Sequence, residues 1–441
     1  MGKKLGLGFI GLIIVGAIYY FMAGSQQLTV QMKKQVNTEL TSIQKEGFSV
    51  ENRDIQKEKE HFVLSFDDTN KIAKFLTRQG LQLNVNDASF LKGFKLGIDV
   101  NYLADAYSAV AFDIYPLALP SLILSIAEDD KEKAILQKLL DKKTFLAHIA
   151  VNKLGTGFKG NMKDINEVLH GKQNVTLKMQ GLTFSGDIKA QRISSIKEEV
   201  STLSLLVDDD VAFTFSGVKS DYLITGKTPY DYRMNYSIDK MQAHASSKFN
   251  LLANDIVMHS DSTVKNGLAS GSMQAKTKSM QVTTKAKTYL FDTFAFKTHA
   301  KGLDISAFEK LQEINVNNEQ EVNALLQQMM SKGVSFEIPT FSVQNIEAEG
   351  QKLNGFDITA HVNLDKSFDI TALQVNPMSA LSSVDANLHL SLSKELFGLV
   401  AQVPQAMMAL MLFQPKDENG KKVYNLELKD SKFTVNGMPV N

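Results

Sequence analysis

The chain has 441 residues, 44% of them hydrophobic, and its 48 basic and 48 acidic side chains balance to a net charge of zero. This balance argues against a nucleic-acid partner, which normally requires a basic face. The absence of cysteine excludes disulfides and lipid attachment through a cysteine thiol, so the fold depends on packing alone.

The first predicted element is an N-terminal membrane anchor over residues 5–23. This segment carries no charge, and Lys3 and Lys4 of the short tail 1–4 precede it directly. A helix of this length spans about 28 Å, close to the roughly 30 Å hydrocarbon core of a bilayer. The lysines favour a cytoplasmic tail, which places the remaining chain outside the cytoplasm. The apolar side chains of the anchor are Leu5, Phe9, Ile10, Leu12, Ile13, Ile14, Val15 and Ile18.

A cleaved signal peptide is the alternative for this segment, with a cut after Ser25 that leaves Ala23 at the −3 position. Its apolar run is longer than the usual signal-peptide core of about 7–15 residues, which favours retention. The run also contains a literal GxGxxG pattern at residues 6–11. No strand precedes this pattern, so it does not predict a dinucleotide site.

Residues 24–46 form a predicted helical stalk, because apolar residues recur at three- and four-residue spacing from Leu28 to Ile43. The region 47–300 is predicted to be rich in strands. Runs such as 61–66 and 281–287 alternate polar and apolar residues, as half-buried strands do. A short helix beginning at Asp68 or Thr69 and an exposed helix over 128–143 interrupt this pattern.

Residues 301–441 are predicted to form a second β-rich region with helices. Asp304 or Ser306 begins one helix, residues 318–331 form another, and Ser393 begins a helix that extends to Phe413. Strands are expected at 334–338, 356–362, 368–373, 384–392, 424–428 and 432–435. The predicted class is therefore α+β, mainly β: an N-terminal transmembrane helix, then long curved antiparallel β-sheet meanders with a few packed helices.

The segment 424–439, a polar–apolar strand followed by an Asp-containing turn and Phe-Thr-Val-Asn-Gly, resembles the closing pattern of the YdgA/YihF family of bacterial envelope proteins. Residues 302–311 and 325–338 are also similar to that family. The chain departs from the family pattern after Gly47-Phe48, where charged residues replace a Gly-rich aromatic strand. The resemblance implies an inner-membrane anchor and a strand-rich periplasmic body, and it carries over no catalytic residue. Envelope proteins of similar layout, such as the AsmA group, are linked to lipid handling, which is an analogy of fold only.

The sequence predicts no catalytic, cofactor-binding or metal-binding residue, and no cofactor. None of its eight histidines forms HxxxH or HExxH, and no GxSxG elbow or Walker loop occurs. The acidic run 208–210 lacks the alternate oxygens and central glycine of an EF-hand, which favours a solvated turn.

The apolar segment 396–413 has three competing interpretations. It is a helix packed in the core, a lipid- or partner-binding helix, or a second membrane span interrupted by Pro404. Under the second interpretation, the contacting residues are Phe397, Val400, Met407, Met408, Met411 and Phe413.

The expected function is that of a non-enzymatic periplasmic protein, anchored once in the bacterial inner membrane. It would bind lipid, another envelope protein or a second copy of itself through an apolar groove or a sheet edge. An exported hydrolase with a site assembled across strands, or a structural part of a motility or secretion machine, are the alternatives. An apolar lining of the concave face favours lipid, and a polar lining favours protein.

Overall fold

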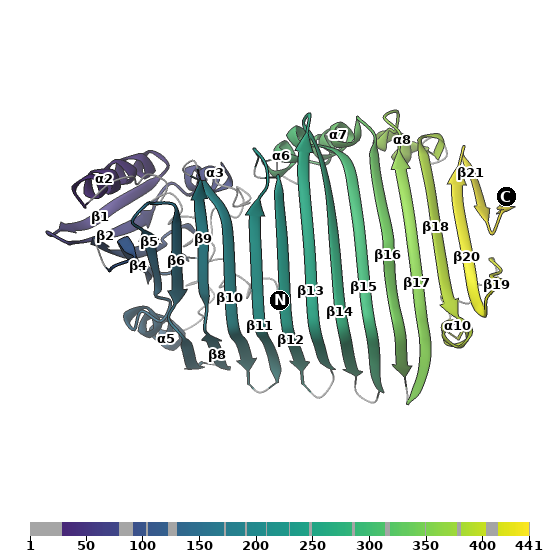
Figure 1. The fold of residues 1–441 in the computed structure, drawn as a ribbon, viewed down its shortest axis with the longest axis horizontal. Helices are drawn as coiled ribbons and strands as arrows, with labels where there is room; N and C mark the ends of the chain where they lie inside the picture. The colour runs from purple at the N-terminus through teal and green to yellow at the C-terminus, as the bar shows by residue number, and fades with distance from the viewer. Residues whose placement is uncertain are drawn as a thin grey trace. The chain divides into compact units, whose positions relative to one another are not determined.

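The computed structural model describes residues 29–78, 91–102, 105–121, 130–171, 173–189, 192–208, 210–228, 230–246, 249–284, 287–313, 318–348, 350–376, 381–402 and 413–440. These residues contain 22 strands and seven α-helices, which confirms the mainly β prediction (Figure 1). The predicted anchor at 5–23 lies outside the described residues. Of the helices that are described, none is both long and apolar enough to cross a membrane.

The chain divides into two compact units, Met1–Asp208 with Gly217–Ile224, and Asp209–Ser216 with Thr225–Asn441. We call them unit 1 and unit 2. Strand β11 (Val211–Ile224) contributes to both.

Unit 1 is an antiparallel sheet covered by helices. Its helices are α2 (Thr29–Lys45), α3 (Thr69–Arg78) and α5 (Asp130–Asp141). Its strands are β1 (Phe48–Ile55), β2 (Lys59–Phe66), β3 (Lys95–Tyr102), β4 (Ser108–Ala118), β5 (Ala147–Asn152), β6 (Gly157–Met162), β7 (Ile165–His170), β8 (Asn174–Gln180), β9 (Thr183–Lys189) and β10 (Arg192–Val207). Pairing runs β1–β2–β3–β4–β5–β6–β9–β10, and β8 pairs with β7 and with the second half of β10.

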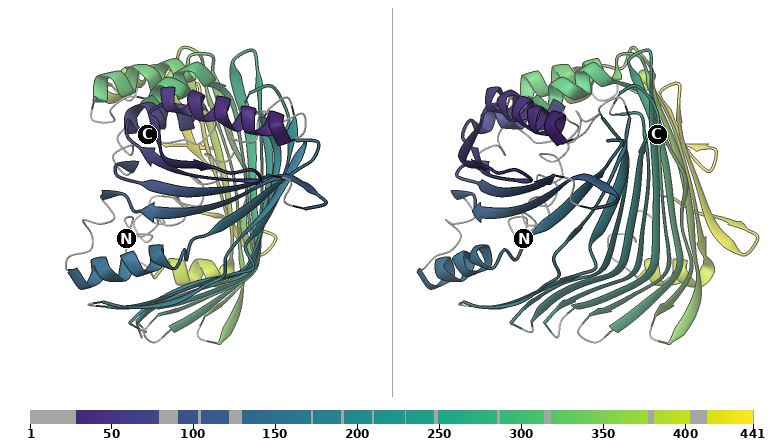
Figure 2. Two further views of the ribbon diagram at one scale, coloured as in Figure 1. Left: turned by 90° about the vertical axis from the view of Figure 1, so that its left-hand side faces the viewer. Right: turned by 60° about the vertical axis from the view of Figure 1, so that its left-hand side comes forward.

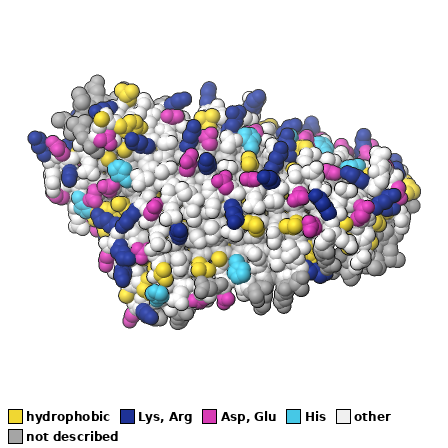
Figure 3. All heavy atoms as spheres, turned by 60° about the horizontal axis from the view of Figure 1, so that its bottom comes forward, with side chains coloured by type: hydrophobic (Ala, Val, Ile, Leu, Met, Phe, Trp, Pro, Cys, Tyr) yellow, Lys and Arg dark blue, Asp and Glu magenta, His cyan; other side chains and the backbone are white. Residues whose placement is uncertain are grey.

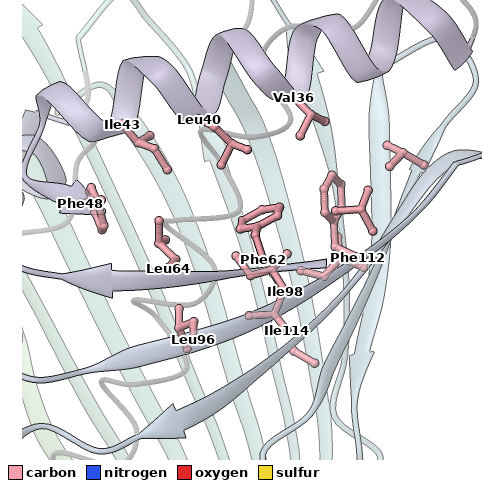
Figure 4. Packing of buried hydrophobic residues seen from close by; sticks show 14 of the residues in the cluster. Val36, Leu40, Ile43, Phe48, Phe62, Leu64, Leu96, Ile98, Phe112 and Ile114 are labelled. Atoms are coloured by element: carbon pink, nitrogen blue, oxygen red, sulfur yellow. The ribbon is translucent and has the colours of Figure 1, made fainter. Parts of the chain in front are cut away.

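The core of unit 1 lies between α2 and one face of its sheet. Val36, Leu40 and Ile43 recur every three or four residues along α2 and are all buried. They point toward alternate side chains of the strands, among them Phe62, Leu64, Leu96, Ile98, Phe112 and Ile114 (Figure 4). Each fully buried side chain of this size stabilises the fold by about 1.5–3 kcal/mol.

A buried carboxylate also connects α2 to this sheet. Glu60 is 3% exposed, and its two oxygens accept hydrogen bonds from Arg53 Nε at 2.6 Å and from the Tyr102 hydroxyl at 2.8 Å. Arg53 donates a further bond to Asn37 of α2 at 2.7 Å. The hydrogen bonds from Arg53 and Tyr102 satisfy the Glu60 carboxylate, whose charge would otherwise be costly to bury.

Unit 2 is an antiparallel meander in which each long strand pairs with its neighbour in the sequence. Its strands are β12 (Tyr232–Ala245), β13 (Phe249–Lys265), β14 (Leu268–Thr284), β15 (Lys287–Asp304), β16 (Val334–Ala348), β17 (Gln351–Leu364), β18 (Val384–Ser393), β19 (Lys416–Glu418), β20 (Lys421–Lys429), β21 (Lys432–Val435) and β22 (Met438–Pro439). Pairing follows the chain from β12 to β18 and continues to β20, whose far edge carries β19 and β21. β22 pairs with β21 and ends the meander.

The helices of unit 2 are α6 (Ile305–Glu313), α7 (Glu319–Met330), α8 (Ile370–Val375) and α10 (Lys394–Val400). The predicted caps are confirmed at Asp304, which accepts from the Ala307 N–H at 3.0 Å, and at Ser393, which accepts from the Leu396 N–H at 3.1 Å. The strand predicted at 368–373 is wrong. The Asp369 side chain accepts from the N–H groups of Thr371 and Ala372, and this cap starts α8 instead.

Candidate functional site

One face of the unit 2 sheet is apolar across its width. Consecutive strands place directly opposite one another the residues Tyr236, Met258, Ala275, Phe296, Phe341, Ile358, Leu390 and Tyr424. Two residues away on each strand lies a second row, composed of Ile238, Ile256, Thr277, Phe294, Val343, Phe356 and Leu392. Because side chains alternate between faces, both rows lie on the same side, which we call the apolar face.

The opposite face carries polar side chains. One row there contains Asp261, Ser272, His299, Glu337, His361, Asn387 and Glu427. Figure 3 views one side of the molecule, on which charged and histidine side chains are widely spread and hydrophobic ones form small separate groups. The sheet of unit 2 is thus amphipathic, as an antiparallel sheet with one solvated face should be.

A line of unpaired positions crosses six strands of this sheet, and the register is the same on both sides of it because each of two partners skips one residue. Pairing skips one residue in each of β12 to β17, namely Asp239, Asp255, Lys278, Thr293, Gln344 and Gly355. Asp255 and Thr293 have positive φ angles of 52° and 55°, and a Cβ on Gly355 would collide with the Val343 carbonyl oxygen. We call these six positions the bend line.

The bend line keeps the apolar face continuous. Beyond it, the next opposed row is Met241, Ala253, Met280, Phe291, Ile346 and Leu353. In every strand this row is three residues from the second row instead of two, so the extra residue shifts the alternation by one position and keeps the apolar residues on one face. The five non-glycine residues of the bend line are polar and exposed. Figure 2 shows the unit 2 strands bending along their length, with α6, α7 and α10 on the inner side of the bend.

The apolar face is only partly covered. Phe341 contacts Phe294, Phe296 and Phe356 with ring centroids 5.9, 6.0 and 5.3 Å apart, all in edge-on geometry. Most residues of the face remain half-buried, and Phe336 and Met273 are 43% and 39% exposed. The principal buried cluster of the described residues belongs entirely to unit 1. A large apolar surface that is only half-buried is typical of a site that binds an apolar ligand or partner.

The predicted contact segment 396–413 is described at its two ends. Phe397 of α10 lies 5.7 Å from the Lys422 ammonium, and Phe413 lies 6.4 Å from Phe433. Lys422 and Phe433 are opposite Leu392 and Leu428, so both ends are beside the apolar face. Val400 ends α10 and is half-buried. Met407, Met408 and Met411 lie outside the described residues.

Sequence reasoning missed the apolar face itself. Its residues are distributed over eight strands at every second position, and no single strand is unusual. The available signal was the three-residue step, visible as Ile238 to Met241 in β12 and again as Phe291 to Phe294 in β15. This step becomes informative only after the strands are aligned.

The titratable groups of the polar surfaces form cross-strand pairs. In unit 1, His61 Nδ1 lies 2.6 Å from Asp99 Oδ1, and His148 Nδ1 lies 2.7 Å from Asp113 Oδ1. In unit 2, Glu337 lies between His299 and His361, at 3.5 and 3.7 Å. Within the described ranges, no three histidine or acidic side chains are grouped so that they could hold a metal ion. These pairs stabilise neighbouring strands.

A pocket of about 690 Å³ lies on the sheet surface of unit 1. Its lining includes His148, Lys159, Asn161, Lys197 and Glu199, from strands β5, β6 and β10. Thr183 and Ser185 of β9 also line this pocket.

The fold and the face together define a mainly β protein with a bent, amphipathic antiparallel sheet. Residues 121–441 match the model of a family described as a bacterial protein of unknown function (DUF945), and the chain belongs to this family. Searches of curated proteins and of solved structures find no match to the chain.

Proposed function

We propose that this protein is a non-enzymatic binding protein of the bacterial envelope, tethered to the inner membrane by residues 5–23, with the body in the periplasm. Its unit 2 sheet holds the acyl chains of a lipid against the apolar face. The observation that carries the proposal is the continuity of that face across β12 to β20, with much of it half-exposed. The resemblance to YdgA/YihF envelope proteins and the uncharged N-terminal segment support the proposed location.

The chemistry of the face favours lipid over a protein partner. Its opposed rows contain aliphatic and aromatic side chains and very few hydrogen-bonding groups. A protein interface normally combines an apolar centre with a polar rim and about one hydrogen bond per 100–200 Å². An acyl chain needs no such bonds, and each methylene group that leaves water contributes about 0.8 kcal/mol.

The proposal predicts that glutamate on the apolar face removes bound lipid. We would purify the full chain in detergent with Met273→Glu and Phe336→Glu, and count retained phospholipids by native mass spectrometry. Both side chains are exposed enough to be replaced without opening a core. We expect at least about a tenfold loss of lipid, because each carboxylate places a charge where the chain would lie.

The matched control is Val257→Glu, since Val257 is 51% exposed but belongs to the polar face, opposite Ser237 and Lys276. It should retain lipid at the level of the unchanged chain. Equal loss in the control, or full retention in the apolar-face variants, contradicts the proposal. Loss of β-sheet signal in circular dichroism identifies a variant that failed to fold, and Met273→Gln then replaces it.

A further inference from the structure

One end of the unit 1 sheet gathers exposed apolar side chains and lysines. It is built from the β1–β2 turn, the segment before β4, the β5–β6 turn and the end of β9. Ile55, Tyr107 and Leu154 are 56%, 39% and 71% exposed there. We call this end the tip, with its apolar residues Ile55, Tyr107 and Leu154 and its lysines Lys57, Lys59, Lys153, Lys159 and Lys189.

Backbone hydrogen bonds hold the parts of the tip together. The Tyr102 N–H donates to Glu58 O at 2.9 Å, which joins the end of β3 to the β1–β2 turn. The Lys153 N–H donates to Tyr107 O at 3.1 Å, and the Ile188 N–H donates to Thr156 O at 2.8 Å. The tip is therefore one structured surface of unit 1.

The stalk helix α2 starts at the same end. Lys33, near the beginning of α2, donates through Nζ to the carbonyl oxygens of Gln56 and Lys57 at 2.7 and 2.6 Å. Only residues 24–28 separate the predicted span from Thr29. Five residues reach at most about 18 Å in any conformation. If residues 5–23 cross the bilayer, Thr29 lies within that distance of its surface, and Lys33 contacts the tip about one helical turn further along α2.

The charges at the tip fit an anionic surface. With Lys33 and Lys34 of α2, the tip has seven lysines. Its carboxylates number four, on Asp54, Glu58, Asp105 and Asp187. Three of those carboxylates are bound locally, to the Gln56 amide, to the backbone N–H of Ser108 and to the Ser195 hydroxyl. In the described part of the chain, Lys57, Lys59, Lys153 and Lys189 make no ion pair.

We infer that the tip is a membrane-docking surface for anionic phospholipid, which rests on the tether in the proposed function. Leu154, Ile55 and Tyr107 enter the headgroup region, and the lysines bind lipid phosphates. This arrangement of apolar and aromatic residues beside lysines is the one that interfacial contacts use. Docking fixes the orientation of unit 1 relative to the bilayer, whereas an anchor alone would leave that orientation variable.

The test uses the absence of cysteine, because a single Leu154→Cys substitution provides the only labelling site. The full chain, carrying an environment-sensitive fluorophore at position 154, is reconstituted into phosphatidylcholine vesicles with or without phosphatidylglycerol. Lipids with spin labels near the headgroup act as quenchers. We expect at least about twofold quenching in the anionic vesicles. The control label at Val168→Cys, also an exposed residue of unit 1 but in β7, should not respond.

A charge variant tests the role of the lysines. Lys59→Glu with Lys153→Glu should abolish the quenching at position 154, because each lysine near an anionic surface changes the contact equilibrium about fivefold. Vesicle flotation separates the two proposals. A chain that does not float contradicts the tether. A chain that floats but shows equal quenching at positions 154 and 168 overturns the tip contact alone. Equal quenching at position 154 without phosphatidylglycerol overturns the assignment to anionic lipid.

Discussion

The two units use the same strand alternation and cover the resulting apolar face differently. In unit 1, α2 lies over the strands, and the residues between them are almost fully buried. In unit 2, the helices lie toward the ends of the strands, and the apolar rows remain half-exposed (Figure 2). A packed core gives stability, whereas an uncovered face keeps surface available for a ligand. The comparison shows a closed apolar core in unit 1 and a half-open apolar face in unit 2, and the proposed lipid binding rests on that open face.

The largest expected effect is a difference in the stability lost when a phenylalanine is replaced by alanine in unit 1 and in unit 2. Phe62→Ala removes a side chain with 0% exposure from the core of unit 1 and should lower the free energy of unfolding by about 3–5 kcal/mol. Phe336→Ala, on the half-open apolar face, should cost less than about 1 kcal/mol. Hydrogen exchange with mass spectrometry, read in peptides from β2 to β4 and from β15 to β17, measures both. Equal losses of protection would remove the distinction between core and face.

A second variant tests the bend line. Gly355→Ala should destabilise the β16–β17 pairing by about 1–3 kcal/mol, because the new methyl group meets the Val343 carbonyl oxygen. Gly398→Ala is the control: Gly398 lies in α10 with nothing within 4 Å of a Cβ, and alanine favours a helix by about 1 kcal/mol. Denaturant unfolding followed by circular dichroism compares the two. Equal stability of both variants would show that close backbone contact at Gly355 is unimportant.

A smaller effect of opposite sign is expected at Thr293. Its φ of 55° is unfavourable for a β-branched residue, so Thr293→Gly should raise the free energy of unfolding by up to about 1 kcal/mol. Thr263→Gly, in a regularly paired part of β13, should lower it by about 1 kcal/mol. Thermal unfolding of both variants checks the signs. A loss of stability in both would mean that Thr293 is not strained.

The smallest expected effect is a pH dependence in unit 1. Burial raises the pKa of Tyr102 above its ordinary value of 10.0, and the hydrogen bond to Glu60 acts in the same direction. The folded state therefore keeps this proton when the unfolded state releases it. Its contribution to stability is complete below about pH 10 and decreases as the pH rises further. Tyr102→Phe should make the unfolding free energy decrease less steeply with pH above about pH 10, measured by denaturant titration. An unchanged slope would contradict this role.

Much of the fold follows from local pattern in the sequence. Alternation predicted the strand at 61–66, which the structure extends to Lys59–Phe66, and side-chain capping predicted the starts of α6 and α10. The prediction failed at 368–373, where the alternating pattern was read as a strand and the Asp369 cap was overlooked. Caps depend on one side chain, so they are easily missed beside a longer periodic signal.

The candidate site was harder to predict than the fold. Residues 396–413 stood out because their apolar side chains are consecutive, yet the largest apolar surface comes from residues far apart in the chain. Tyr236 and Tyr424 lie in the same row only because seven strand pairings connect them. The phase shift at the bend line also needs six aligned strands to be recognised. Such properties belong to the register of the sheet and not to any segment alone.

The nearest-neighbour order of β12 to β18 has a consequence for how this protein changes in evolution. Removal of one strand would reverse the direction of every later strand. Removal of two adjacent strands would leave later strands in the same direction, with the same side chains on the apolar face. A duplicated or deleted hairpin would therefore widen or narrow the apolar face by about 10 Å, twice the usual strand spacing, without a new fold. Chain length in this family should accordingly vary in steps of one hairpin.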